Sequence, residues 1–91
     1  MSCEAAVPCY IRALESKSQY PRALSNLGIS YGNLNAYDAA ARCYLKALSL
    51  NPEARHIWDY LRLTFTSMHR PDLVEKTTQM DHEAFRAEFE F

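Results

Sequence analysis

The sequence contains an internal repeat with an offset of 34 residues. Residues 9–14 match residues 43–48 at every position, either identically or by a conservative change. Residues 5–6 fall on residues 39–40, which are also alanines, at the same offset. Matches at eight positions in one register exceed what chance would give. A unit this short cannot bury its own apolar face, so the repeat predicts a fold made by stacking similar units.

Composition and charge favour helices and exclude several classes of protein. Only two of the 91 residues are glycine, too few for a many-turned β chain, and apolar residues make up 48%. The net charge of -1, with no Lys/Arg cluster, argues against a protein that binds the nucleic-acid backbone. No apolar run approaches the roughly 18 residues of a membrane span. The first residues also lack the basic start and apolar stretch of a signal peptide.

A period of 34 residues is that of the tetratricopeptide repeat, a pair of antiparallel helices. The repeat pattern can be followed in this chain at Leu24, Leu27, Gly28, Tyr31, Ala40, Tyr44, Ala47 and Pro52. Leucine replaces the usual first tryptophan, and Tyr44 replaces a phenylalanine. Because the two helices of a repeat pack closely, we expect the small residues Gly28 and Ala40 where the backbones approach.

The pattern predicts an all-α protein, a tetratricopeptide-repeat α-α superhelix with a C-terminal helical cap. We expect three parts: the second helix of a truncated repeat at residues 1–16, a complete repeat at 21–52, and a following helix with a C-terminal helical bundle at 54–91. The individual helices are predicted at residues 3–16, 21–34, 37–50, 54–68, 72–79 and 82–90. The start within a repeat suggests a fragment of a longer array. Its first helix would then lack a partner and favour self-association.

Aromatic residues characterise the predicted last helix. Phe85 and Phe89 are spaced to lie on one face of a helix. The acidic residues of this segment would suit a solvated face, but Phe85, Phe89 and Phe91 favour packing. We therefore expect the tail to pack back on the repeats as a closing cap. In the helix predicted at 54–68, Arg62 stands where the repeat pattern has glycine. This puts close packing of that helix against a standard second helix in doubt.

Polar side chains recur along one face of the predicted helix 21–34. Asn26 and Asn33 are seven residues apart, almost two helical turns, so their side chains point the same way. Arg22 precedes Asn26 by one turn, and Ser30 follows it by one turn. First helices line the concave surface of stacked helix pairs, where ligands usually bind. Carboxamides suit a peptide backbone and guanidinium groups suit carboxylates, but a merely solvated face explains the stripe equally well.

No motif for catalysis or metal binding is present. The three cysteines form no Cys-x-x-Cys pair and are expected to be reduced packing residues in a reducing compartment: Cys3, Cys9 and Cys43. The three histidines lack a partner at zinc-ligand spacing: His56, His69 and His82. There is no glycine-rich phosphate loop, nucleophile elbow or paired-carboxylate motif. We therefore expect neither enzymatic activity nor a cofactor.

Residues 23–31, followed by Asn33 with Leu34 and by Ala47 with Leu48, closely resemble the last canonical repeat of a known family. This family comprises the peroxisomal (glycosomal) type-1 targeting signal receptors, the peroxin-5 family. Residues 57–58 and 61–63 resemble the helix that leads into the receptors' C-terminal helical bundle. The resemblance covers about residues 4–76 and is weakest in the tail.

The resemblance implies a receptor for cargo proteins that end in a Ser-Lys-Leu type signal. Such receptors bind cargo in the cytosol and carry it to the peroxisome or glycosome membrane, where docking proteins contact regions missing from this chain. By analogy, Asn26 and Asn33 bond the signal's backbone and terminal carboxylate, and Arg22 acts on the carboxylate. The family also uses asparagines of the preceding first helix and earlier repeats, so at most half a site is present here.

Two other functions fit a tetratricopeptide repeat. An adaptor for chaperone tails needs several basic residues on successive first helices to hold two carboxylates. The positions 34 residues beyond Arg22 and Asn26 hold His56 and Tyr60, which make a poor clamp. A purely structural segment without a peptide ligand is the third possibility. The residue pattern leaves these alternatives open.

Overall fold

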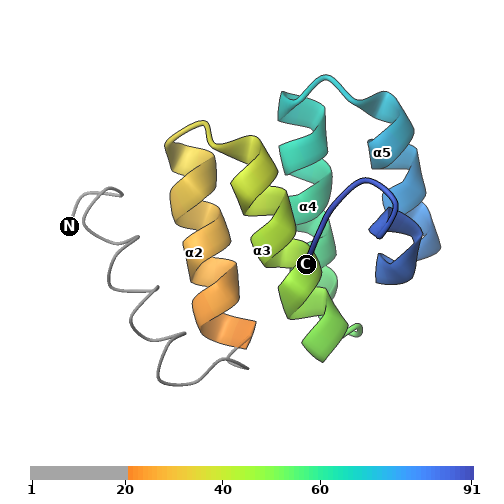
Figure 1. Ribbon diagram of the computed structural model, residues 1–91, viewed down its shortest axis with the longest axis horizontal. Coiled ribbons are helices and arrows are strands. Elements are labelled where there is room, and N and C mark those ends of the chain that lie inside the picture. Colours follow the sequence, from red (N-terminus) through yellow and green to blue (C-terminus); the bar gives the residue numbers. More distant parts are fainter. Residues whose placement is uncertain (1–20) are drawn as a thin grey trace.

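The computed structural model describes residues 21–91, so the predicted helix at 3–16, with Cys3 and Cys9, lies outside the described residues. The described part consists of α2 (Pro21–Asn33), α3 (Tyr37–Leu50), α4 (Arg55–Ser67), α5 (Pro71–Lys76) and the short 3-10 helices η1 (Thr77–Gln79) and η2 (His82–Phe85). The α-helices stand side by side in chain order across the molecule (Figure 1). No strand occurs within residues 21–91, and the predicted all-α class is confirmed.

Helices α2 and α3 form an antiparallel pair whose bounds agree with the predicted helices to within one residue. Pro21 begins α2 at a position where its missing N–H costs no helical hydrogen bond. A Cβ atom added to Gly28 would lie 2.7 Å from Cε1 of Tyr44. Ala40 is fully buried. The absence of a side chain at Gly28 therefore leaves room for the ring of Tyr44 on α3, and Ala40 is buried as a small residue, whereas the predicted approach of the two backbones stays a prediction.

The core lies between α3, α4 and the C-terminal segment. Leu45 and Leu48 of α3 pack with the expected apolar residues of α4, all at most 2% exposed: Trp58, Leu61 and Phe65. The indole Nε1 of Trp58 donates a hydrogen bond to the carbonyl oxygen of Pro52 at 3.2 Å. This bond ties the start of α4 to the loop before it and orients the largest core side chain.

Arg62 shows how the chain departs from the repeat after α4 begins. Its Nε donates to Oγ1 of Thr77, 3.3 Å away, and Thr77 is fully buried. A glycine at this position would allow a second helix to approach closely. Here the long polar side chain of Arg62 contacts the α5–η1 segment, which is shorter than the second helix α3 of the preceding repeat.

The C-terminal segment differs from its predicted helices. The helix predicted at 72–79 is present as α5 continued by η1, and it ends where Met80 adopts a left-handed conformation with φ of 50°. The prediction of a helix at 82–90 is wrong, because only one 3-10 turn forms, at η2. After that turn the Arg86 side chain donates to the Phe91 carbonyl and lies over the Phe91 ring, 3.9 Å from its centroid. These contacts draw the chain back, whereas a continued helix would carry Phe91 away.

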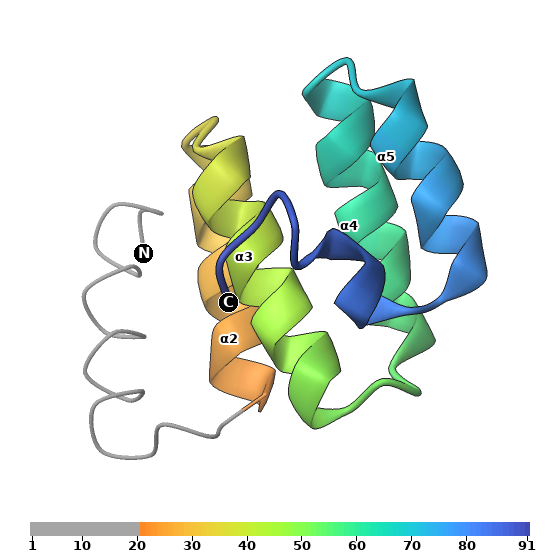
Figure 2. The same cartoon turned by 45° about the vertical axis from the view of Figure 1, so that its right-hand side comes forward.

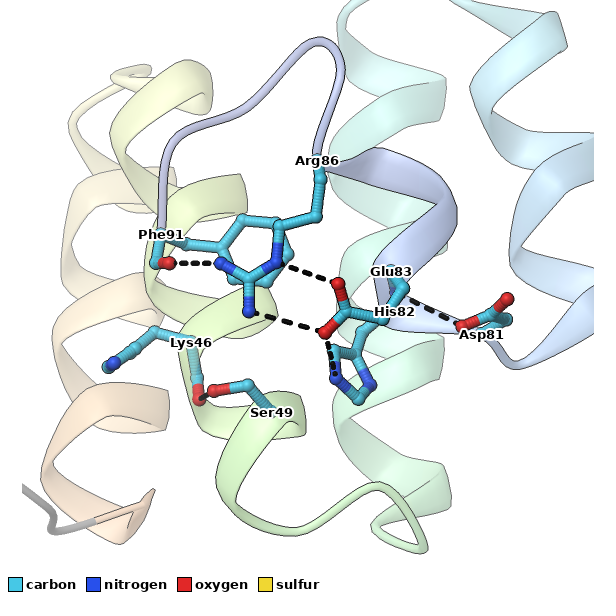
Figure 3. Close-up of polar contacts among 7 residues, drawn as sticks. All are labelled: Lys46, Ser49, Asp81, His82, Glu83, Arg86 and Phe91. Carbon is cyan, nitrogen blue, oxygen red and sulfur yellow. Dashed lines mark hydrogen bonds and ion pairs between the residues drawn. The ribbon is translucent and has the colours of Figure 1, made fainter.

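The tail nevertheless packs back on the helices, which confirms that prediction. Phe85 is fully buried and Phe89 is 7% exposed, and their ring centroids lie 5.5 and 5.7 Å from that of Phe65. Figure 2 shows this segment folded against α3 and α4. In Figure 3, Arg86 lies between Phe91 and Glu83, whose carboxylate it contacts through Nε at 3.0 Å. Buried aromatic rings and polar contacts of Arg86 together hold the tail against the helices.

Candidate functional site

Two neighbouring hollows lie along the groove between α2 and α4. The first has a volume of about 450 Å³ and is lined by Pro21, Arg22, Ser25, Asn26, Ile29, Asn51, Ala54, His56, Ile57 and Tyr60. The second has a volume of about 370 Å³ and is lined by Ile29, Gly32, Asn33, Tyr37, Tyr44, Tyr60, Leu63, Thr64 and Ser67. Ile29 and Tyr60 line both hollows, so the two are compartments of one groove. We call them the basic hollow and the tyrosine hollow.

The predicted binding residues of α2 face this groove but divide between its compartments. Arg22 and Asn26 line the basic hollow, whereas Asn33 lines the tyrosine hollow. Ser30 does not belong to the predicted stripe, because it is only 6% exposed and lines neither hollow. Its hydroxyl donates to the carbonyl oxygen of Asn26 at 3.1 Å, inside the same helix. The polar stripe of the groove thus consists of three residues rather than four.

The two hollows differ in charge. Arg22 and His56 line the basic hollow, and none of its lining residues within the described range 21–91 is a carboxylate. Among the same described residues, no Asp, Glu, Lys, Arg or His lines the tyrosine hollow. Burial raises the pKa of Tyr44, and the neighbouring Tyr60 adds to this shift, so the Tyr44 hydroxyl stays neutral at physiological pH. The groove therefore offers one end to an anion and the other to an uncharged group.

His56 and Tyr60 contribute to the groove from α4, although the sequence analysis considered them only as a chaperone-tail clamp and did not assign them to the peptide site. The Tyr60 ring stacks on Tyr44 with centroids 5.8 Å apart, and the His56 ring meets its edge at 6.2 Å. These two residues stand 34 positions after Arg22 and Asn26. Since equivalent positions of stacked repeats line the same face, the repeat register was the signal that could have found them.

Other chemically reactive side chains lie apart from one another. Burial raises the pKa of the Cys43 thiol to about 11, with a partly opposing effect of Arg42, so at neutral pH it is protonated and a poor nucleophile. His82 lies 3.1 Å from Glu83 through its Nε2. Residues 21–91 bring together no group of three side chains able to hold a metal ion. Within the same range, no helix has the length and apolar character needed to cross a membrane.

Comparisons with known proteins agree with the helical pair. The tetratricopeptide-repeat family model matches residues 21–54. The chain is 36% identical over 100 residues to a peroxisomal targeting signal receptor of Kluyveromyces lactis, an alignment covering 97% of this chain and 18% of the relative. The receptor of the same name from Eremothecium gossypii is 34% identical over 102 residues, with the same two coverages.

A third match is shorter and has a higher identity. The peroxisomal targeting signal 1 receptor of Dictyostelium discoideum is 46% identical over 52 residues, which is 57% of this chain and 8% of the relative. The chain spans about a fifth of the length of the yeast relatives it matches. Residues 21–54 thus carry a tetratricopeptide repeat, and the chain is similar in sequence to the corresponding segment of the peroxisomal targeting signal receptors.

Proposed function

We propose that the α2–α4 groove binds the C-terminal residues of cargo proteins that carry a Ser-Lys-Leu type targeting signal. The observation that carries this proposal is the basic hollow, where Arg22 and Asn26 stand together and no carboxylate of the described residues 21–91 is among the lining. Asn33 lies further along the same groove. The names of the related proteins support a receptor role.

The spacing of the two asparagines suits a short extended peptide. Asn26 and Asn33 are seven residues apart in α2, which corresponds to about 10 Å along the helix axis. Three residues of extended chain also span about 10 Å. In this arrangement Arg22 pairs with the terminal carboxylate, Asn26 bonds the backbone near the last residue, and Asn33 bonds it near the fourth residue from the end.

The wider role that we propose is that of an import receptor. The receptor captures cargo in the cytoplasm, cycles to the peroxisome or glycosome membrane and meets docking proteins there. Its action consists of binding and release, and no covalent chemistry is assigned to it. The groove described here supplies one wall of the cargo site in this scheme.

The groove disfavours one of the two alternatives and leaves the other to be tested. A chaperone-tail clamp needs basic residues on both α2 and α4. The counterparts of Arg22 and Asn26 on α4 are His56 and Tyr60, so α4 presents no Lys or Arg to the groove. A purely structural segment would make no use of Asn26 and Asn33, and removing their carboxamides tests that possibility.

The test is a double variant, Asn26→Ala with Asn33→Ala, titrated with a peptide ending in Ser-Lys-Leu and followed by chemical shifts of the ¹⁵N-labelled chain. We expect an unchanged helical spectrum and thermal unfolding curve, with peptide binding reduced at least tenfold. Gln79→Ala is the matched control, because it removes an exposed carboxamide that lines neither hollow. Wild-type affinity in the double variant would contradict the roles proposed for Asn26 and Asn33, whereas absence of peptide binding to the unaltered chain would favour the purely structural interpretation.

A further inference from the structure

His56 is a residue of the basic hollow that neither the fold nor the proposed contacts of α2 with a peptide require. It belongs to α4, whereas Arg22 and Asn26 belong to α2, and all three side chains line the same hollow of about 450 Å³. His56 is exposed and makes no hydrogen bond or ion pair with any residue of the described range 21–91. Its ring nitrogens therefore have no partner among these residues and can bond a ligand.

Aromatic contacts hold the His56 ring on the groove side of α4. The ring meets the edge of Tyr60, one helical turn later, with centroids 6.2 Å apart and ring planes at 89°. Tyr60 in turn stacks on Tyr44 of α3, with centroids 5.8 Å apart. Ile57 and Trp58, which follow His56 in the chain, are each only 2% exposed, so the buried side of α4 fixes the direction of His56. A ring positioned in this way costs less to order when a ligand binds.

The groups around His56 include a cation but no acidic partner in the hollow. Within residues 21–91, six titratable groups line the basic hollow, stack behind it or stand within one turn of His56 along the chain: Arg22, Tyr44, Glu53, Arg55, Asp59 and Tyr60. Neither of the two carboxylates lines the hollow, and Asp59 lies 3.8 Å from Arg62 instead. Protonation of His56 in the empty groove therefore adds a second cation to the hollow of Arg22, and a bound anion would balance both.

A peptide carboxylate can use donors from both walls of the groove. An ionised carboxylate has two oxygens with about four acceptor sites, and Arg22 and Asn26 approach it only from α2. A neutral histidine ring donates through one nitrogen, whereas a protonated ring donates through both and carries a positive charge. A carboxylate in the hollow thus gains a partner on α4 whose contribution increases when His56 takes up a proton.

We propose that His56 is a second partner of the cargo's C-terminal carboxylate, so that the carboxylate is held between α2 and α4 and binds more tightly when His56 is protonated. This inference rests on the proposed function of the groove. Histidine side chains change charge between about pH 5 and pH 8, whereas a C-terminal carboxylate stays ionised throughout that range. Because linkage is reciprocal, affinity for a free-acid peptide rises as pH falls through this window, and peptide binding draws a proton onto the chain.

Fluorescence anisotropy at pH 7.5 and pH 5.5 tests this inference. The ligands are a peptide ending in Ser-Lys-Leu, carrying a dye insensitive to pH, and its C-terminally amidated twin. We expect the free acid to bind wild type about three- to fivefold more tightly at pH 5.5, the gain of an exposed charge pair, while the amide changes little. In His56→Asn, which keeps a donor but cannot gain a proton, affinity for the free acid should be the same at both pH values.

His69→Asn is the matched control for the variant. His69 is exposed, lines neither hollow and has a left-handed backbone conformation, with φ of 58°, that asparagine tolerates. This control should keep the wild-type dependence on pH. Calorimetry of wild type in two buffers of different ionisation enthalpy gives a readout that needs no variant. It should detect proton uptake on binding of the acid and none on binding of the amide.

The outcomes separate the role of His56 from the proposed function. A preference of wild type for the acid over the amide that is equal at both pH values, without proton uptake, would overturn the role of His56 and leave the proposed function standing. A dependence on pH that survives in a folded His56→Asn variant would do the same. Equal binding of acid and amide at both pH values, or no binding of either, would overturn the proposed function and this inference together.

Discussion

The α2–α4 groove and the C-terminal end of the molecule use their polar side chains in opposite ways. At the C-terminal end, Arg70 contacts Asp72 at 3.1 Å and Glu88 at 2.7 Å, and Arg86 contacts Glu83. In the groove, the side chains of Arg22, Asn26 and Asn33 make no hydrogen bond or ion pair with any residue of the described range 21–91. One region satisfies its polar groups internally, and the other presents them to the groove.

This difference predicts which substitutions change the stability of the fold and which change peptide binding. Buried aromatic packing stabilises the C-terminal end, while surface ion pairs such as those of Arg70 add little each. In the groove, removal of the Arg22, Asn26 or Asn33 side chain breaks no hydrogen bond or ion pair within the described residues 21–91. Substitutions in the first region should therefore change the free energy of unfolding, and substitutions in the second should change peptide affinity.

The largest effect is expected for Phe85→Ala. Phe85 is fully buried and its ring lies within 6.3 Å of those of Phe65 and Trp58, centroid to centroid. Truncation leaves a cavity between α3, α4 and the tail, and should lower the free energy of unfolding by about 3–5 kcal/mol. Urea denaturation followed by Trp58 fluorescence measures the loss. A loss under about 1 kcal/mol would mean that the tail does not cap the core.

A smaller loss is expected for Gly28→Ala, which tests the close contact of α2 with α3. The added methyl group would lie 2.7 Å from Cε1 of Tyr44, so the Tyr44 ring or the two helices must shift, at a cost of about 1–3 kcal/mol. Gly32→Ala is the matched control in the same helix, since its Cβ would meet no atom within 4 Å. The control should be neutral or stabilising by up to about 1 kcal/mol, because alanine is the better helix former. Equal unfolding curves for both variants would contradict the contact.

Arg22→Gln should separate binding from folding. The exposed guanidinium group makes no ion pair within residues 21–91, so the free energy of unfolding should change by less than about 0.5 kcal/mol. Loss of a charge-assisted bond should weaken a free-acid peptide about tenfold, with little effect on its amide. Affinity measured by fluorescence anisotropy for both peptides checks this. A large loss of stability would indicate that Arg22 stabilises the fold instead of serving the proposed peptide site.

The smallest effect concerns the pH dependence of the tail. Bonding to Arg86 lowers the pKa of Glu83 below its ordinary value of 4.5, and bonding to Arg70 lowers that of Asp72 below 3.8. Because both folded-state values are depressed, the stabilisation is complete above the ordinary pKa values and is lost as pH falls through the lowered ones. Thermal unfolding between pH 6 and pH 3 should show a modest decline that Glu83→Gln reduces. An unchanged slope in that variant would contradict a role for the Glu83 pair.

The sequence predicted the α2–α3 pair closely because the repeat encodes it in local signals. Gly28 and Ala40 mark the close contact, and Pro21 and Pro52 flank its two ends. The groove residues Arg22, Asn26 and Asn33 followed from helical spacing alone, but the division of the groove into two hollows did not. That division depends on Tyr60, whose place is set by how α4 packs against α2.

The sequence was least informative after α4, where the repeat ends. The spacing of Phe85 and Phe89 suits an α-helix, yet a single 3-10 turn also directs both rings into the core. The path beyond it depends on Arg86 lying over Phe91, a contact with no signature in composition or period. The assignment of Ser30 to the polar stripe was also wrong. Its hydroxyl donates a hydrogen bond within α2, and its side chain does not line the groove.

The most direct test of the groove as a carboxylate site compares two peptides that differ only at their C-terminus. A labelled peptide ending in Ser-Lys-Leu and its C-terminally amidated twin are titrated with the chain by fluorescence anisotropy. The account predicts that the free acid binds at least tenfold more tightly than the amide, because only the acid presents a charge to the hollow of Arg22 and Asn26. Equal binding of the two peptides would contradict it.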